Sequence, residues 1–310
     1  MYFLIMSFTA ISIGYAVPTE GFDAAVHSAF QSTLNLRLRG DDGLLTLLAS
    51  SKGDLPQGMR LNTPKDFSFE DIQVGEAALC RDGILHFKNS SLAIQLNEAR
   101  RWKCDLPALK FNPTNPAVSA AWSLVWNALN KRQRLMGSEI AAEDLFHLST
   151  LGQAGMLHRV GKAIRGLLNA ARQYELTDAS AVHSLIGLGP GLTPSGDDIL
   201  VGYMAGLWCT VDGSSERAQF ISSLGKTIIE LSDKTNDISR TYLYHAVRGQ
   251  VSSRLANLAE AICRGAEPER LHVTAETALS VGHTSGMDTV YGLLSGLDAW
   301  EGNQLKNNTE

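Results

Sequence analysis

Hydrophobic and polar positions alternate along the first third of the chain, from residue 30 to about residue 100. In STLNLRLRGDDGLLTLLAS, Leu34, Leu36 and Leu38 share one face, and an Asp42-Gly43 step precedes a second leucine-rich run. GEAALCRDGILHF repeats the arrangement around another Asp-Gly step. Because Asp-Gly tolerates the positive φ of tight hairpin turns, the pattern predicts antiparallel hairpins. The first third is expected to form a small antiparallel β domain, closed as a barrel or packed as a sandwich.

The first 17 residues, MYFLIMSFTAISIGYAV, are apolar and uncharged. They lack the positive region of a secretory signal and are short for a transmembrane helix. Their β-branched and aromatic residues favour a leading β-strand, with a signal and an anchor as the alternatives. We therefore expect a cytoplasmic protein without a membrane partner.

The period of the apolar residues changes after a proline-rich segment, DLPALKFNPTNP. Its three prolines cannot continue a helix or a central strand, which predicts a linker over residues 105–116. Beyond it, apolar residues recur three and four positions apart in four long segments, 116–136, 152–175, 214–234 and 267–282. This is helical spacing, and Thr177 and Ser214 are expected as N-caps. The predicted fold is α+β, with a β domain over 1–104 and a mostly helical domain over 117–310.

Charge and cysteine content narrow the possible partners. The formal net charge is −5 and no basic run occurs, which argues against nucleic acid and anionic membrane surfaces. The four cysteines form no CxxC pair, which argues against a disulfide framework or a cysteine zinc site. This usage fits a reducing cytosol.

Residues 187–202, GLGPGLTPSGDDILVG, concentrate glycines and prolines ahead of an apolar run. Gly189 and Gly191 permit backbone conformations closed to other residues, giving a rigid loop that a ligand can approach closely. Ser195 is expected as the N-cap, with Asp198 reaching back as in a capping box. The N–H groups at Ser195 and Gly196 would then attract phosphate or carboxylate. The alternative is a helix start with ordinary caps.

Asp197 and Asp198 cannot perform the same task, since neighbouring helix positions diverge by about 100°. If one aspartate caps the helix, the other can bind a cation, accept a proton or hydrogen-bond a substrate amide.

A second stretch, GHTSGMDTVYGLLSGL at residues 282–297, repeats S-G-x-D-x3-G-x3-G-L ninety positions later. Ser285, Gly286 and Asp288 match Ser195, Gly196 and Asp198. Glycines four apart give each helix a smooth stripe, so we expect the two helices to pack there. Their N-terminal loops would converge on one site with approximate two-fold symmetry. Chance similarity of two small-residue helices is the alternative.

The two copies differ where chemistry would differ. Thr193 corresponds to His283, and Asp197 corresponds to Met287. His283 is a candidate general acid or base, although a lone histidine can also be a structural hydrogen-bonding group.

A third candidate segment is KTNDISRTYLYHAVRG at residues 234–249. Asn236 or Asp237 is expected to cap a helix that carries Arg240. The Arg240 guanidinium suits a carboxylate or phosphate, and a solvated surface arginine is the alternative.

Together, GLGPGLTPSGDDILVG, the downstream Ser-Arg step and GHTSGMD resemble a bacterial family that includes the H subunit of oxamate carbamoyltransferase from anaerobic allantoin utilisation. AVHSAFQSTLNLRL and GDLPQGMRL are similar too, so the resemblance covers nearly the whole chain. It implies an enzyme of three subunits, this chain with two partner subunits. The implied reaction interconverts oxalurate plus phosphate with oxamate plus carbamoyl phosphate, and it assigns no residue a role.

The motifs define the candidate site residues. The expected catalytic residues are Asp197, Asp198, His283 and Asp288. The residues expected to bind small anionic substrates or phosphate are Gly189, Gly191, Thr193, Ser195, Gly196, Asn236, Arg240, Ser285 and Gly286. No metal ligand is assigned and no cofactor is required, although phosphorylated substrates often bring Mg²⁺.

Two other functions remain open from the sequence. One is a non-catalytic subunit whose glycine loops bind a partner chain or an allosteric ligand. The other is an independent metal-dependent hydrolase that uses Asp197, Asp198 and Asp288.

Overall fold

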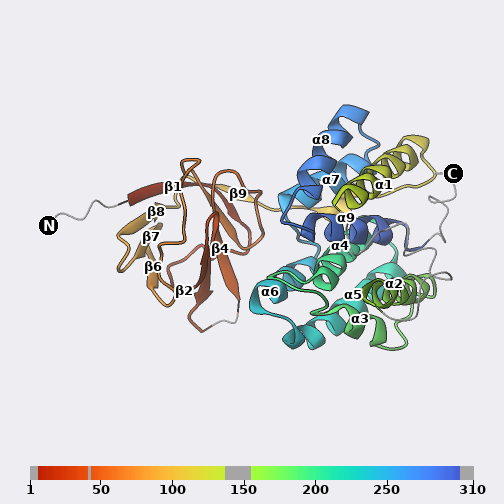
Figure 1. Ribbon diagram of the computed structural model, residues 1–310, viewed down its shortest axis with the longest axis horizontal. Coiled ribbons are helices and arrows are strands. Elements are labelled where there is room, and N and C mark those ends of the chain that lie inside the picture. The colour runs from red at the N-terminus through yellow and green to blue at the C-terminus, as the bar shows by residue number, and fades with distance from the viewer. Residues whose placement is uncertain (1–5, 41–42, 137–154, 301–310) are drawn as a thin grey trace. The chain divides into compact units, whose positions relative to one another are not determined.

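The computed structural model describes residues 6–40, 43–136 and 155–300. It divides the chain into two compact units, Met1–Lys103 and Cys104–Glu310 (Figure 1). The first unit is built of β-strands and the second of helices, which confirms the predicted α+β fold.

The first unit is a closed barrel. Its strands follow the order β5-β4-β3-β2-β6-β7-β8-β1, and β1 pairs again with β5 to close the ring, while β9 adds to the side of β1. Most neighbours are antiparallel, but β1–β8, β1–β9 and β4–β5 are parallel. The strand bounds are β1 Met6–Gly14, β2 Phe22–Phe30, β3 Thr33–Leu38, β4 Leu44–Leu48, β5 Gly58–Leu61, β6 Ala77–Arg81, β7 Ile84–Phe87, β8 Leu92–Gln95 and β9 Arg100–Trp102.

The two predicted hairpins are present. β3 pairs antiparallel with β4, and β6 with β7. Asp82 and Gly83 have φ of 51° and 73°, the positive values that a two-residue type I′ turn requires. Asp42, in the other predicted turn, lies outside the described residues. The leading apolar segment forms β1, as the strand interpretation expects.

Leucines from the alternating pattern fill the barrel, with Leu34, Leu36 and Leu47 fully buried. Polar groups that enter this core are paired across strands. Thr46 Oγ1 donates to Asn35 Oδ1 at 2.9 Å. Pairing of this kind removes the cost of burying an amide and a hydroxyl.

The GDLPQGMRL segment closes the barrel. A Cβ on Gly14 would lie 2.1 Å from the carbonyl oxygen of Leu55, so β1 approaches this segment too closely for any side chain. Asp54 accepts hydrogen bonds from Ser12 and from Arg60 Nε, and Arg100 forms an ion pair with its other oxygen at 3.3 Å. The segment therefore joins β1, β5 and β9 at one point.

The second unit contains the helices α1 Pro116–Met136, α2 Met156–Arg172, α3 Ser180–Leu185, α4 Ser195–Cys209, α5 Ser215–Leu231, α6 Asp237–Ala246, α7 Ser253–Cys263, α8 Pro268–Leu279 and α9 Ser285–Leu297. Short 3-10 turns, η1 Leu106–Leu109 and η2 Ser232–Lys234, complete it. Residues 105–116, expected as a linker, belong to this unit, because Leu106 and Phe111 of this segment are buried. Within the described residues, none of the helices combines the length and apolarity needed to cross a membrane.

Of the two caps predicted for the helices away from the glycine motif, Thr177 and Ser214, one is correct. Ser214 caps α5 by accepting a hydrogen bond from the Arg217 amide. The Thr177 prediction is wrong, because α3 begins at Ser180, and the Asp178 carboxylate accepts the Ser180 amide at 2.7 Å. Aspartate two residues before a helix serves this purpose as well as threonine does, and the apolar pattern alone could not place the first turn.

Candidate functional site

The site is organised by α4 and α9, which pack along their glycines (Figure 1). A Cβ on Gly202 would lie 1.9 Å from the Thr289 carbonyl oxygen, and one on Gly292 would lie 2.1 Å from that of Ile199. The two contacts are equivalent: Gly292 lies ninety positions after Gly202, and Thr289 lies ninety positions after Ile199. An approximate two-fold axis therefore relates α4 and α9. The predicted packing of the two glycine stripes is therefore confirmed.

The loops that precede the two helices converge, as the repeated motif predicts. Thr193 Oγ1 and Ser285 Oγ lie 2.8 Å apart, a hydrogen bond between loops 92 residues apart in the chain. The helices that precede the two loops, α3 and α8, are also in equivalent positions. A Cβ on Gly196 would meet the Leu185 carbonyl at the end of α3, and one on Gly286 would meet the Ala278 carbonyl in α8. Each half is therefore a helix, a tight loop and a buried helix.

The predicted cap of α4 is wrong. The N-cap is Pro194, Ser195 is the first helical residue, and no side chain caps either α4 or α9. Proline fixes the entry backbone instead, and this frees the Ser195 hydroxyl from capping.

The glycine amides expected to bind an anion are already used. Gly196 N–H donates to the Leu188 carbonyl at 2.9 Å, and Gly286 N–H donates to the Val281 carbonyl at 2.9 Å. These contacts favour a packing role for both glycines, and the substrate-binding role predicted for them is not tested. Among the described residues, the amides of Ser195 and Ser285 have no hydrogen-bond acceptor, as is usual at first helical positions.

Asp198 and Asp288 occupy equivalent positions, each the fourth residue of its helix. Burial raises the pKa of Asp288 to about 6, against hydrogen bonding from Ser195 and Thr284 that favours the charged form. Burial also raises the pKa of Asp198 well above its usual value, and the neighbouring Asp288 charge adds to this, while Ser285 and Thr193 act in the opposite direction. The two carboxyl groups thus share one weakly solvated region, where a carboxyl group can hold a proton near neutral pH.

Asp197 points elsewhere and holds three segments together. Its Oδ1 accepts the Gly187 amide at 2.8 Å, while Oδ2 accepts Thr235 Oγ1 at 2.5 Å and Ser239 Oγ at 2.7 Å. These bonds tie the start of the loop to η2 and α6. They favour a positioning role for Asp197, and the catalytic role predicted for it is not tested.

We expect Asp197→Asn to lower the free energy of unfolding by about 2 kcal/mol, because an amide replaces a carboxylate that accepts three hydrogen bonds. Hydrogen exchange in residues 187–194 should accelerate, and mass spectrometry of exchanged peptides would measure it. Met287 occupies the equivalent position in α9, so Met287→Leu is the matched control and should change loop exchange little. Unchanged exchange in Asp197→Asn would contradict the role.

The α6 segment supplies two predicted residues, Asn236 and Arg240, and one that the sequence did not indicate. Asn236 is the N-cap, one of the two predicted alternatives, and it accepts the Ser239 amide at 3.0 Å. The substrate-binding role predicted for it is not tested. Arg240 pairs with Asp237 at 2.5 Å, and its Nε is buried without a partner among the described residues. The missed residue is Tyr242, whose pKa is raised to about 12 by burial and by the Asp198 charge. Its position, three residues after Ser239 on the same helix face, is the signal that could have found it.

The remaining predicted residues lie on the loops. Gly189 and Gly191 have φ of 109° and 97°, which only glycine adopts readily. A Cβ on Gly189 would lie 3.0 Å from the Ser195 amide nitrogen, whereas the space around Gly191 is open. His283 is exposed in the turn before α9 and makes no hydrogen bond to the described residues.

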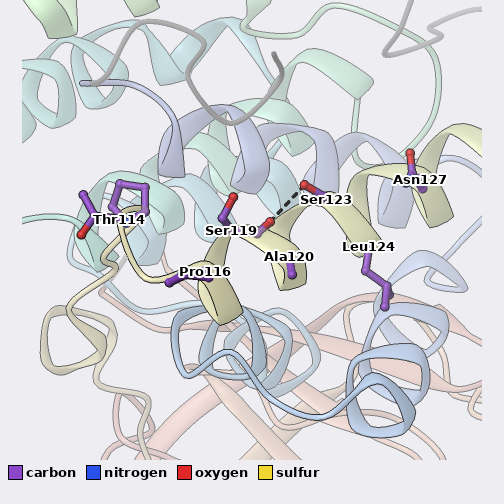
Figure 2. A pocket seen from close by; sticks show the side chains of 8 residues that line it. Thr114, Pro116, Ser119, Ala120, Ser123, Leu124 and Asn127 are labelled. Carbon is purple, nitrogen blue, oxygen red and sulfur yellow. Dashed lines mark hydrogen bonds between the residues drawn. The ribbon is translucent and has the colours of Figure 1, made fainter. Parts of the chain in front are cut away.

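A groove beside α1 offers less chemistry than the paired helix starts. The groove has a volume of ≈ 720 Å³, and its lining side chains are drawn in Figure 2. It is lined by Pro113, Thr114, Pro116, Ser119, Ala120, Ser123, Leu124 and Asn127. This lining includes no titratable side chain, so it cannot supply acid or base catalysis. Within the described ranges, no three His, Cys, Asp or Glu side chains gather as metal ligands.

The fold and site define a two-unit protein in which a β-barrel precedes a helical unit built around paired, aspartate-bearing helix starts. Comparison with protein families gives two matches. Residues 9–101 match the AllH family N-terminal domain, and residues 185–297 match the family described as oxamate carbamoyltransferase subunit AllH. The chain belongs to the AllH family. No solved structure gives a significant match.

Proposed function

We propose that this chain is a subunit of a carbamoyltransferase and that its paired loops contribute directly to the active site. The observation that carries the proposal is that Asp198 and Asp288, in the first turns of two matched helices, lie close enough to interact in a member of the AllH family. The proposed reaction interconverts oxalurate plus phosphate with oxamate plus carbamoyl phosphate, within allantoin degradation. The family description names a subunit, which supports a complex of several chains.

The chemistry assigns roles to groups that face each other. Phosphate oxygen attacks the carbamoyl carbon, the new C–O bond forms, and the C–N bond to oxamate breaks. The proton lost by phosphate must reach the leaving nitrogen. Asp198 and Asp288 are suited to accept the first proton and donate the second, since raised pKa values keep a carboxyl proton present near neutral pH.

Two other groups fit the charges of the substrates. The Ser195 and Ser285 amides can stabilise negative charge on the carbamoyl oxygen. Arg240 can bind the oxamate carboxylate or the phosphate, because its Nε has no partner among the described residues. The role of His283 stays a prediction, as do the two partner subunits, the cytoplasmic location and any use of Mg²⁺.

The two alternative functions are less favoured by these contacts. A metal-dependent hydrolase would need Asp197, but its carboxylate already accepts three hydrogen bonds. A purely partner-binding loop would not need two buried carboxyl groups with raised pKa values, which cost folding free energy at neutral pH.

The test is carbamoyl phosphate formation from oxalurate and phosphate by this chain combined with its two presumed partner subunits. We expect activity in the complete set and a loss of about a hundredfold or more with Asp198→Asn, the usual size of general acid–base catalysis. Asp233→Asn, an exposed aspartate on η2, is the matched control and should retain activity. A correctly assembled Asp198→Asn complex with full turnover would make the loops non-catalytic.

A further inference from the structure

Two carboxylate oxygens in the site are buried without any donor. Oδ2 of Asp198 and Oδ2 of Asp288 make no hydrogen bond to the described residues. Asp288 is only 1% exposed, so water does not satisfy its carboxylate from the surface. A buried carboxylate oxygen that lacks a donor is costly, and two such atoms in neighbouring groups are more costly still.

The surrounding groups do not remove this cost. Besides each other, the charged and titratable groups that face the pair are Asp197 on α4 and Tyr242 on α6. Asp197 adds negative charge, and Tyr242 is neutral. Arg240 on α6, two positions before Tyr242, is paired with Asp237 instead. No basic side chain among these neighbours therefore neutralises the two carboxyl groups.

The hydroxyl groups arrange the pair symmetrically. Ser195, the first residue of α4, hydrogen-bonds Asp288 of α9, and Ser285, the first residue of α9, hydrogen-bonds Asp198 of α4. Thr193 joins this network through its 2.8 Å contact with Ser285. Each carboxyl group is thus fixed by the opposite helix, and neither can rotate away without breaking a contact between the halves.

We propose that Asp198 and Asp288 carry one proton between them, so that one aspartate is a neutral carboxyl group while the other is a carboxylate. One proton turns one of the two unpartnered oxygens into a donor and removes one of two neighbouring negative charges. The two groups then titrate as a pair, in two separate steps.

The shared proton has a direct use if the proposed transfer reaction is correct, and this part rests on the proposed function. The pair begins as one carboxyl and one carboxylate group. The carboxylate accepts the proton of the attacking phosphate, and the carboxyl group gives its proton to the leaving nitrogen. The pair finishes with one proton, ready for another cycle, and no outside proton donor is needed.

The test is a pH titration of the isolated full-length chain, labelled with ¹³C at the aspartate side-chain carboxyl carbon and followed by NMR from about pH 4 to about pH 9. Asp198→Asn and Asp288→Asn assign the two signals. We expect one carboxyl group of the wild-type pair to be protonated and the other ionised at neutral pH. In Asp288→Asn, the Asp198 signal should titrate at a pH lower by about one unit or more, because the like charge is gone and an amide donor replaces it.

Ionisation of both groups at neutral pH in the wild-type chain would overturn the proposal, and this outcome needs no variant to fold. The experiment contains no substrate, so it separates this inference from the proposed function. A shared proton in a chain whose complex shows no transferase activity would refute the function alone. Full transferase activity with two ionised aspartates would refute the shared proton alone.

Discussion

Gly202→Ala is expected to lower the free energy of unfolding by about 3 kcal/mol, the upper end of the usual cost of overpacking, because the added atom meets rigid backbone. The added Cβ would lie 1.9 Å from the Thr289 carbonyl oxygen and 2.7 Å from the Leu293 amide nitrogen. Both are backbone atoms, so no side-chain rotation relieves the overlap, and the two helices must separate. Urea unfolding followed by circular dichroism would measure the loss.

The approximate symmetry of α4 and α9 leads us to expect the same effect at the equivalent glycine, Gly292. Gly292→Ala would place its Cβ 2.1 Å from the Ile199 carbonyl oxygen, so it should destabilise to a similar extent. Gly166→Ala in α2 is the matched control, since its Cβ would meet only the Ala181 methyl at 3.3 Å. Alanine favours a helix over glycine by about 1 kcal/mol, so Gly166→Ala should be neutral or stabilising. Wild-type stability in Gly202→Ala would contradict the close crossing.

Asp288→Asn should stabilise the chain by about 3 kcal/mol at neutral pH, since one pKa unit corresponds to about 1.36 kcal/mol. Burial raises the pKa of Asp288 from 3.8 to about 6 in the folded chain. Between those values the folded state binds more protons than the unfolded state. Stability of the wild-type chain therefore falls as pH rises through this window, and the full penalty is present above it.

The stability difference between Asp288→Asn and the wild-type chain should depend on pH. The advantage of Asp288→Asn should be small near pH 4 and should grow to its full size by about pH 7. Asp178→Asn is a control of opposite sign, because the Ser180 hydroxyl and amide lower the pKa of Asp178. It should lose stability at neutral pH rather than gain it. An Asp288→Asn chain that is less stable than wild type at neutral pH would show that the carboxylate is not destabilising.

The stability gain is expected to accompany a loss of function. A residue that destabilises the folded state at working pH is retained where its chemistry is needed. Asp288→Asn would therefore raise the stability of the chain while lowering its activity. If the variant were more stable and the complete complex kept full turnover, Asp288 would have no part in the proposed transfer.

Much of the architecture follows from local patterns. Alternating leucines and Asp-Gly steps predicted the hairpins, and helical spacing predicted the second unit. The repeated S-G-x-D pattern predicted that α4 and α9 pack together, because four-residue glycine spacing permits little else on a buried helix. These features depend on residues close together in the sequence, where period and backbone freedom set the structure.

The hydrogen-bond partners of individual polar groups could not be predicted from local sequence patterns. The sequence did not reveal that Asp197 binds Gly187, Thr235 and Ser239, since two of these partners lie about forty residues away. Nor did it reveal that the Gly196 and Gly286 amides are occupied, or that Tyr242 lies beside Asp198. Which donor meets which acceptor depends on how helices distant in the chain are packed.

The sequence by itself therefore determined a β domain built of hairpins, the helical unit and the pairing of two glycine-striped helices, because each rests on a short-range pattern that one face or one turn can satisfy. The closure of the β domain into a barrel came from the tertiary structure. Only the tertiary structure decided the difference between the adjacent aspartates, Asp197 and Asp198. One carboxylate is surrounded by donors and fixes a loop, while the other lies beside a second buried carboxyl group. That difference arises from burial and neighbouring charge, which exist only when α4, α6 and α9 have come together.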